Sequence, residues 1–276
     1  MVQIGESVRG KNVYIVQSTC NPVSSTLMEL LIAIDACKRA SANFITAVIP
    51  YYGYARQDRK TSGREAITAK LVADLLTTAG TTRVLAMDLH TGQIQGFFNI
   101  LVDHIFANPI LVDYFKSLNI DPDEMVCVSP DMGGANRTRH FAKKLDCPIA
   151  IIDKRRPKPN SAEVMNLIGD INGKNCVIID DMVDTAGTLT KAANMLMEKG
   201  ALSVRALATH AVLSGAAYEN IANSQLAELI VTDTIPLRPA PGADTSKIKV
   251  ISIAELIGDV IDKVYNYKPI STSFIF

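Results

Sequence analysis

The sequence predicts an α/β protein made of two related units, each a mainly parallel sheet flanked by helices. Short apolar runs rich in Val and Ile alternate with longer amphipathic stretches, which is typical of strands joined by covering helices. One strand–turn–helix pattern occurs twice along the chain, which indicates a duplicated unit. With 276 residues, of which 48% are hydrophobic and 20% charged, the chain is long enough to bury a core in each unit.

Strands and helices alternate in the first unit. The run VYIVQS predicts a strand, and a helical pattern follows from Leu27 to Ala40. FITAVIP and RVLAMDL predict the next two strands, with a helical pattern from Lys70 to Thr78 between them, and VDHIF is the last strand-like run. Parallel strands present their carboxyl ends at one edge of the sheet, where ligands of such sheets bind.

The second unit repeats this order. The strand Asn175–Ile179, its acidic turn and the helix from Leu189 match Asn12–Val16, its neutral turn and the helix from Leu27. The run SVRALATHAVL follows as FITAVIP follows in the first copy. Because only the second turn is acidic and contains glycine, we expect the second unit alone to bind a sugar phosphate.

The boundary between the units is expected near residues 107–109. This gives domains of residues 1–107 and 108–263, with residues 264–276 completing the first domain. The stretch IPLRPAPGADT predicts a surface loop before the strand KVISI and a helix from Ala254. The apolar tail STSFIF is expected to pack against the protein, because exposed Phe and Ile side chains would be unfavourable.

Composition argues against several classes of partner. Lys plus Arg and Asp plus Glu both number 28, so no net charge favours nucleic acid or an anionic membrane. The five cysteines are widely spaced without a Cys-x-x-Cys pair, and we expect buried free thiols. The chain has no leader-like start and no apolar run near the ~20 residues of a membrane span, so a cytoplasmic location is expected.

The segment NCVIIDDMVDTAGTLTKAANML carries the strongest functional signal. It predicts a buried strand, a turn, and a helix opened by Thr188 or Thr190. A phosphate would fit this turn, which offers backbone N–H groups, two hydroxyls, a glycine and a helix N-terminus. The carboxylates of Asp180 and Asp181 suit vicinal sugar hydroxyls instead. The alternative is an acidic turn that only caps the helix.

This segment resembles the signature of the type I phosphoribosyl-binding family, whose fold consists of phosphoribosyltransferase-type domains. The resemblance implies that Asp180 and Asp181 hold the ribose 2- and 3-hydroxyls. It also implies a 5-phosphate loop made of Asp184, Thr185, Ala186, Gly187 and Thr188. The family contains both users and makers of phosphoribosyl diphosphate, so the motif alone does not fix the reaction.

Four further stretches lie at predicted strand ends: IPYYGYARQDRK, MDLHTGQIQGFF, VSPDMGGANRTR and IIDKRRPKPN. Together, from Val2 to Phe276 and in this order, they resemble ribose-phosphate diphosphokinase, also called phosphoribosyl pyrophosphate synthetase, of the phosphate-activated class. This resemblance implies transfer of the diphosphoryl group of ATP to ribose 5-phosphate with Mg²⁺. Its implied ATP-binding residues are Arg56, Gln57, Asp58 and His90, and its implied metal ligands are His90 and Asp131.

These residues have ordinary alternatives when taken singly. A histidine at a strand end is more often structural, and a surface run of charge is usually only solvated. The basic pair Lys154 and Arg156 is expected on a loop just beyond the strand IAIID, where it would stabilise charge that develops in the transition state. The alternative for that stretch is a solvated basic loop.

The resemblance also implies regulation and assembly. An anion site for inorganic phosphate or a nucleoside diphosphate would be shared between subunits of a hexamer built from dimers, with inorganic phosphate as activator. Its residues in this sequence are Ser7, Arg9, Arg64, Ser271 and Ser273.

Relatives carry a further strand, a helix and an adenine-contacting loop before the position of Met1. Without them the first sheet would be shorter and the nucleotide pocket less complete. This leaves a shortened enzyme, a mis-set start, and a catalytically impaired or regulatory companion subunit as open alternatives. A transferase that consumes phosphoribosyl diphosphate is a further alternative, against which the doubled unit and the nucleotide-type stretches argue.

Overall fold

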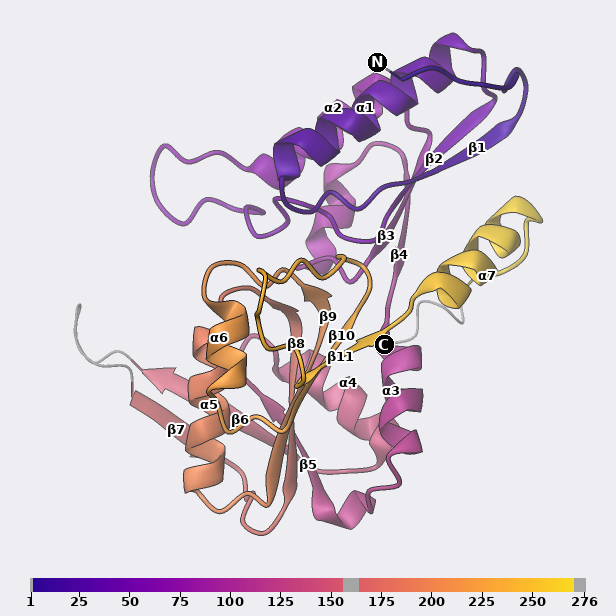
Figure 1. Ribbon diagram of the computed structural model, residues 1–276. Helices are drawn as coiled ribbons and strands as arrows, with labels where there is room; N and C mark the ends of the chain where they lie inside the picture. The colour runs from indigo at the N-terminus through magenta and orange to yellow at the C-terminus, as the bar shows by residue number, and fades with distance from the viewer. Residues whose placement is uncertain (1, 156–163, 271–276) are drawn as a thin grey trace. The chain divides into compact units, whose positions relative to one another are not determined.

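The computed structural model describes residues 2–155 and 164–270, along which strands and helices alternate (Figure 1). The described chain divides into two compact units. Among the described residues, the first unit contains residues 2–106 and 257–270, and the second contains residues 107–155 and 164–256. No helix in the described part of the chain is long and apolar enough to cross a membrane.

The first unit contains a parallel sheet with the strand order β1-β2-β3-β4. Its strands are β1 Asn12–Val16, β2 Phe44–Ile49, β3 Arg83–Met87 and β4 Leu101–Ile105. Helices α1, Val23–Arg39, and α2, Thr68–Ala79, pack on one face of this sheet, and a short 3₁₀ helix, η1, spans Gly92–Phe97. The predicted alternation of strands and helices is confirmed here.

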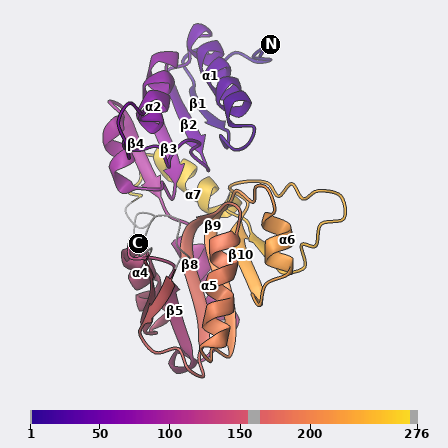
Figure 2. The ribbon, with the colours of Figure 1, turned by 90° about the vertical axis from the view of Figure 1, so that its left-hand side faces the viewer.

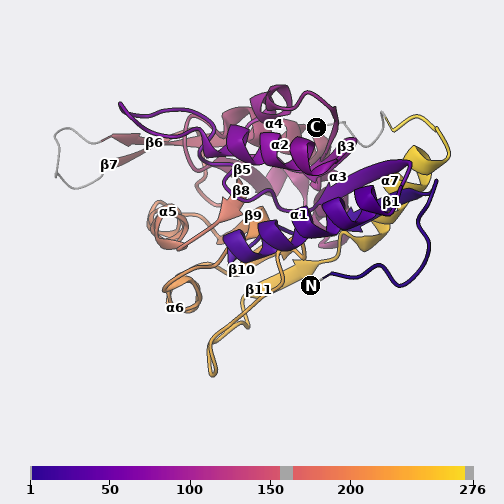
Figure 3. The same ribbon diagram turned by 90° about the horizontal axis from the view of Figure 1, so that it is seen from above.

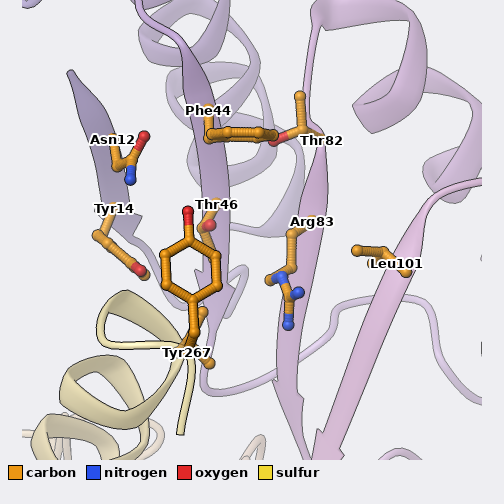
Figure 4. A pocket seen from close by; sticks show the side chains of 9 residues that line it. Asn12, Tyr14, Phe44, Thr46, Thr82, Arg83, Leu101 and Tyr267 are labelled. Atoms are coloured by element: carbon orange, nitrogen blue, oxygen red, sulfur yellow. The ribbon is translucent and has the colours of Figure 1, made fainter. Parts of the chain in front are cut away.

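Successive side chains along each strand of the first sheet point to opposite faces. The two faces have different surroundings. Ile45 and Ala47 of β2 pack in the core under α1 and α2. Thr46 points to the other face, where a hollow of about 260 Å³ opens beside Arg83 and Tyr267, the latter just after helix α7, Ala254–Tyr265 (Figure 4). This hollow lies along the strands rather than at their carboxyl ends.

The second unit contains a sheet of seven strands in the order β11-β10-β9-β8-β5-β6-β7. All neighbours are parallel except β6 and β7, which are antiparallel. The strands are β5 Met125–Ser129, β6 Ile149–Arg155, β7 Val164–Ile168, β8 Asn175–Val183, β9 Ser203–Ala211, β10 Glu228–Thr232 and β11 Ile248–Ile251.

Helices cover both faces of the second sheet (Figure 3). One face carries α5, Gly187–Glu198, and α6, Ala217–Ala222, and the other carries α3, Asn108–Ser117, and α4, Ala135–Leu145. A 3₁₀ turn, η2, spans Pro122–Glu124. Burial on both faces explains why the central strands read as continuous apolar runs rather than alternating ones.

The buried core of the second unit is centred on β8 and α5. Leu189, Ala192, Ala193 and Leu196 of α5 follow helical spacing and face Ile178 and its neighbours in the sheet. All five cysteines are free, and all but the half-buried Cys147 are buried. The α/β fold with parallel sheets flanked by helices is therefore confirmed, while the tail STSFIF lies outside the described residues.

Candidate functional site

The strongest sequence motif forms a strand, a turn and a helix at the carboxyl edge of the second sheet. Strand β8 ends at Val183, and α5 begins at Gly187 after a three-residue turn (Figure 2). The expectation that Thr188 or Thr190 opens the helix is wrong. Ala186 occupies the N-cap position with a left-handed φ of 59°, and the Thr190 hydroxyl donates to the Ala186 carbonyl at 3.0 Å inside the first turn.

Gly187 stands at the start of this helix, and the described residues give no steric reason for a glycine there. A Cβ added at Gly187 would meet only the Thr185 hydroxyl, at 3.9 Å. Thr185 and Thr188 are exposed on either side of it. Space above a helix N-terminus, bordered by hydroxyls, suits an anion that approaches the backbone closely.

The two acids of the motif share one cationic partner that the sequence analysis missed. Arg137, on the first turn of α4, places Nη1 3.3 Å from Oδ1 of Asp181 and 3.6 Å from Oδ1 of Asp180. Asp181 is buried, with only 6% of its side chain exposed, whereas 36% of the Asp180 side chain is exposed. Asp180 is thus the carboxylate more open to a ligand, and Arg137 balances part of the paired negative charge.

The electrostatics of this pair are unusual for surface carboxylates. The pKa of Asp180 is raised from 3.8 to about 7, first by loss of water around the carboxyl group and then by the Asp181 charge. Arg137 and the Asp181 backbone N–H, which donates to Asp180 Oδ1 at 2.9 Å, act in the opposite direction. Asp180 therefore changes charge near neutral pH.

The carboxylate of Asp184 contacts the segment that follows β9. The Ser214 hydroxyl donates to Asp184 Oδ1, and the Ser214 N–H donates to the Asp184 carbonyl at 3.1 Å. Asn220, in α6, donates its side-chain N–H to the Thr185 carbonyl at 2.9 Å. The segment after β9 therefore holds the turn from outside, and these two residues had no recognisable signal in the sequence.

Neighbouring strands bring other predicted residues to the same edge. Asp131 follows β5, which pairs with β8, and its Oδ1 accepts the Gly134 N–H at 2.9 Å just before α4. Lys154 was expected on a loop, but β6 continues through Arg155 because it pairs with β7, so that Lys154 lies opposite Met165 in the ladder. Arg156 lies outside the described residues.

In the first unit, a hydrogen bond joins the loops that follow β2 and β3. Thr91 donates its hydroxyl to Asp58 Oδ2 at 2.8 Å, which joins the Asp58 loop to the turn that carries the half-buried His90. Arg56 and Gln57 are exposed beside Asp58, and the Thr68 hydroxyl donates to Gln57 Oε1. Arg56, Gln57, Asp58 and His90 thus come from two adjacent strand ends.

The residues predicted for an anion regulator lie on separate segments. Ser7 and Arg9 are exposed before β1, and Arg64 is exposed in the loop after β2. That loop is ordered by Glu65, whose pKa is lowered to about 2 because it accepts hydrogen bonds from Ser62 and Thr61. Ser271 and Ser273 lie outside the described residues.

The described residues contain no cluster of three or more His, Cys, Asp or Glu side chains that could hold a metal ion by themselves. His90 belongs to the first unit and Asp131 to the second. Magnesium commonly takes one or two protein carboxylates and completes its shell with water and substrate phosphates. The exposed Asp131 fits a Mg²⁺ ion that arrives with a polyphosphate, not a preformed metal cage.

A parallel sheet with a carboxylate pair, a tight turn and a helix N-terminus at its carboxyl edge is the arrangement that the sequence led us to expect of a phosphoribosyl-binding protein. A crystal structure of phosphoribosylpyrophosphate synthetase from Mycobacterium smegmatis matches with a TM-score of 0.90 and 44% identity, over 97% of this chain and 87% of that one. The N-terminal domain of ribose phosphate pyrophosphokinase matches residues 1–80, and the phosphoribosyl synthetase-associated domain matches residues 153–276.

Curated relatives agree over nearly the whole chain. The ribose-phosphate pyrophosphokinase of Clostridium perfringens is 58% identical over 99% of this chain and 85% of its own length. That of Gloeobacter violaceus is 54% identical over 99% of this chain and 81% of its own length. The chain belongs to the ribose-phosphate pyrophosphokinase family.

Proposed function

We propose that this chain transfers the diphosphoryl group of ATP to the C1 hydroxyl of ribose 5-phosphate, which yields 5-phosphoribosyl 1-diphosphate and AMP. The observation that carries this proposal is the match to ribose-phosphate pyrophosphokinases at 54–58% identity along 99–100% of the chain. A transferase that consumes the product is not favoured, because the matches cover both units of this chain.

Ribose 5-phosphate is proposed to bind at the end of β8. The 2- and 3-hydroxyls donate to Asp180 and Asp181, and the 5-phosphate accepts from backbone N–H groups and hydroxyls between Thr185 and Thr188. Asp184 is proposed to support the turn, because its carboxylate accepts the Ser214 hydroxyl. The C1 hydroxyl is then left free to react.

ATP is proposed to use the strand ends of the first unit. Arg56 and Gln57 bind nucleotide phosphates while Asp58 orients their loop through Thr91. Magnesium, for which Asp131 and His90 are each proposed as a ligand, would neutralise the charge of the triphosphate. During the reaction the C1 oxygen bonds to the β-phosphorus, the bond to the α-phosphate oxygen breaks, and the hydroxyl proton leaves.

Lys154 and Arg156 are proposed to stabilise charge on the transferring phosphorus. Lys154 lies near the end of β6, which pairs with β5, the neighbour of β8, and this place in the sheet supports the role. A group that acts mainly in the transition state changes kcat more than KM. For Lys154→Ala we expect kcat to fall by ~10³-fold or more with a modest change in KM.

The test supplies Mg²⁺, inorganic phosphate, ATP and ribose 5-phosphate, and measures AMP and phosphoribosyl diphosphate together. Equal amounts of both products, lost in Lys154→Ala and kept in Lys144→Ala, an exposed lysine of α4, would support the proposal. ATP-independent turnover would favour a transferase. Ribose 5-phosphate binding without AMP release would favour a regulatory companion subunit.

Regulation by an anion and assembly into a hexamer built from dimers are further parts of the proposal. Arg9 and Arg64 supply exposed guanidinium groups suited to phosphate. Inorganic phosphate should therefore activate the enzyme, and Arg64→Gln should shift the phosphate activation curve to higher concentration. Sedimentation velocity measures the assembly state.

A further inference from the structure

The turn that carries His90 is held by the last residues of the neighbouring strand β4. The Asp88 N–H donates to the Ile105 carbonyl at 2.9 Å, and the Leu89 N–H donates to Nε2 of His104 at 2.9 Å. Asp88 has a φ of 40°, a conformation that residues with side chains rarely adopt. Such a turn persists only where its surroundings hold it, and here β4 provides two of the bonds.

His104 is itself held in one orientation. Only 4% of the residue is exposed, and its ring centroid lies 4.3 Å from that of Phe106. Gln95 of η1 places its amide nitrogen 3.4 Å from the other ring nitrogen, Nδ1, and donates to the Gly92 carbonyl at 3.0 Å. Because Nε2 accepts the Leu89 N–H, that ring nitrogen carries no proton.

The far end of the same turn is fixed by the loop after β2. Thr91 donates its hydroxyl to Asp58 Oδ2 at 2.8 Å. His90 therefore stands between two anchored neighbours, Leu89 bound to β4 and Thr91 bound to Asp58. This arrangement restrains the backbone on both sides of His90.

We propose that His104 is a positioning residue for the nucleotide half of the reaction. By accepting the Leu89 N–H, it fixes the turn so that His90 is presented to the metal–ATP complex before the nucleotide arrives. Pre-organisation of this kind lowers the ordering cost of binding. The inference rests on the role proposed above for His90, and it adds a buried residue that does not itself touch the nucleotide.

The main test compares His104→Leu, which removes the acceptor at similar volume, with His104→Gln, whose side-chain oxygen reaches about as far as Nε2. Loss of one buried hydrogen bond and of the turn's order should raise the KM for MgATP about tenfold in His104→Leu. The KM for ribose 5-phosphate should stay within about twofold, and His104→Gln should recover most of the ATP effect.

A matched control separates positioning from general loss of stability. Thr82 makes two hydrogen bonds of 3.0 Å with the Ile45 backbone at the opposite end of the same sheet. Thr82→Val should lower the melting temperature without raising the KM for MgATP. An equal rise in that KM for Thr82→Val and His104→Leu, at similar loss of stability, would overturn the inference.

His90→Ala distinguishes failure of the inference from failure of the proposed site. If His90→Ala weakens MgATP while His104→Leu leaves it unchanged, the positioning role is refuted and the proposed ATP site stands. If His90→Ala leaves MgATP unchanged, the ATP role of His90 is refuted and the inference with it.

Hydrogen exchange of the unmodified protein without nucleotide gives a test that needs no variant to fold. The Leu89 amide should be protected to the level of the β3 amides, because its acceptor is in place before ATP binds. Exchange at the rate of an open loop would contradict the pre-organised turn.

Discussion

At the scale of single residues, the charge of Asp180 suits its proposed role in binding ribose but lowers the stability of the free protein. Its carboxyl is less ionised than an exposed Asp because burial and Asp181 oppose the charge. An ionised carboxylate is a stronger acceptor for ribose hydroxyls than a protonated one. The residue proposed to bind the sugar is therefore one whose charge the free protein accommodates poorly, as is common at functional sites.

This conflict predicts the behaviour of Asp180→Asn. The folded protein holds a proton on Asp180 up to about pH 7, whereas the unfolded chain releases it near 3.8, so the free energy of unfolding decreases as pH rises through that window. At pH 8 the variant should be more stable by about 1 kcal/mol, since the side chain is 36% exposed and water screens its charge. At pH 4 the difference should vanish.

Thermal unfolding from pH 4 to 8 measures this effect, with Asp113→Asn, an exposed carboxylate of α3, as the control. Asp180→Asn should also bind ribose 5-phosphate at least tenfold more weakly than the unmodified protein at pH 8. A pH-independent stability difference between Asp180→Asn and the unmodified protein would show that the Asp180 charge is not the cause.

Residues of the site differ in how well the sequence reveals them. Asp180 and Asp181 lie near the end of the buried strand β8, and Gly187 begins the helix after it. Because all three fall within one short window, local order suffices to find them. Arg137 does not, because its partner Asp181 is 44 residues away and the contact depends on β5 pairing with β8. Lys154 was placed on a loop for a similar reason, because pairing with β7 extends β6 beyond the apolar run.

At the scale of elements, the turn between β8 and α5 depends on the segment that follows β9. Ser214 bonds to both the side chain and the backbone of Asp184, and Asn220 bonds to Thr185. Helix α6, which supplies Asn220, has only six residues, and such short elements lack the periodicity from which helices are predicted. The longer α1, α2 and α7 carry that periodicity and were predicted.

We expect Ser214→Ala to loosen the turn between β8 and α5 without unfolding the unit. The loss of one hydrogen bond to a carboxylate should raise the KM for ribose 5-phosphate about tenfold and leave the KM for MgATP within about twofold. Steady-state kinetics with each substrate varied in turn measures both. Ser117→Ala, which removes a hydroxyl at the end of α3, is the matched control. Equal effects of Ser214→Ala on both substrates would argue against a local role.

At the scale of the whole molecule, each unit has its own buried core. Leu76 of α2 and Leu196 of α5 are both 0% exposed, one in each core. Two compact units with separate cores follow from the duplicated strand–turn–helix pattern, which is why the fold class was predictable from sequence. The place of α7 was harder to predict in detail, because the chain returns to the first unit at Ile257, within that helix.

Separate cores predict separate losses of stability. Leu76→Ala and Leu196→Ala should each cost about 2–5 kcal/mol in the unit that contains the cavity. Ribose 5-phosphate should then raise the melting temperature of the transition weakened by Leu196→Ala, but not that weakened by Leu76→Ala. Calorimetry with and without the sugar phosphate measures this. Identical single transitions that respond equally to ribose 5-phosphate would contradict independent unfolding.

The buried cysteines give this division a practical consequence. Cys37 is 3% exposed in α1 and Cys176 is 1% exposed in β8, one in each unit, and burial raises the pKa of both thiols, that of Cys176 to about 12. Alkylating reagents need a thiolate that they can reach, so both sites should react only when their own unit opens. Timed labelling followed by peptide mass spectrometry would thus report the opening rate of each unit separately, through Cys37 for the first and Cys176 for the second.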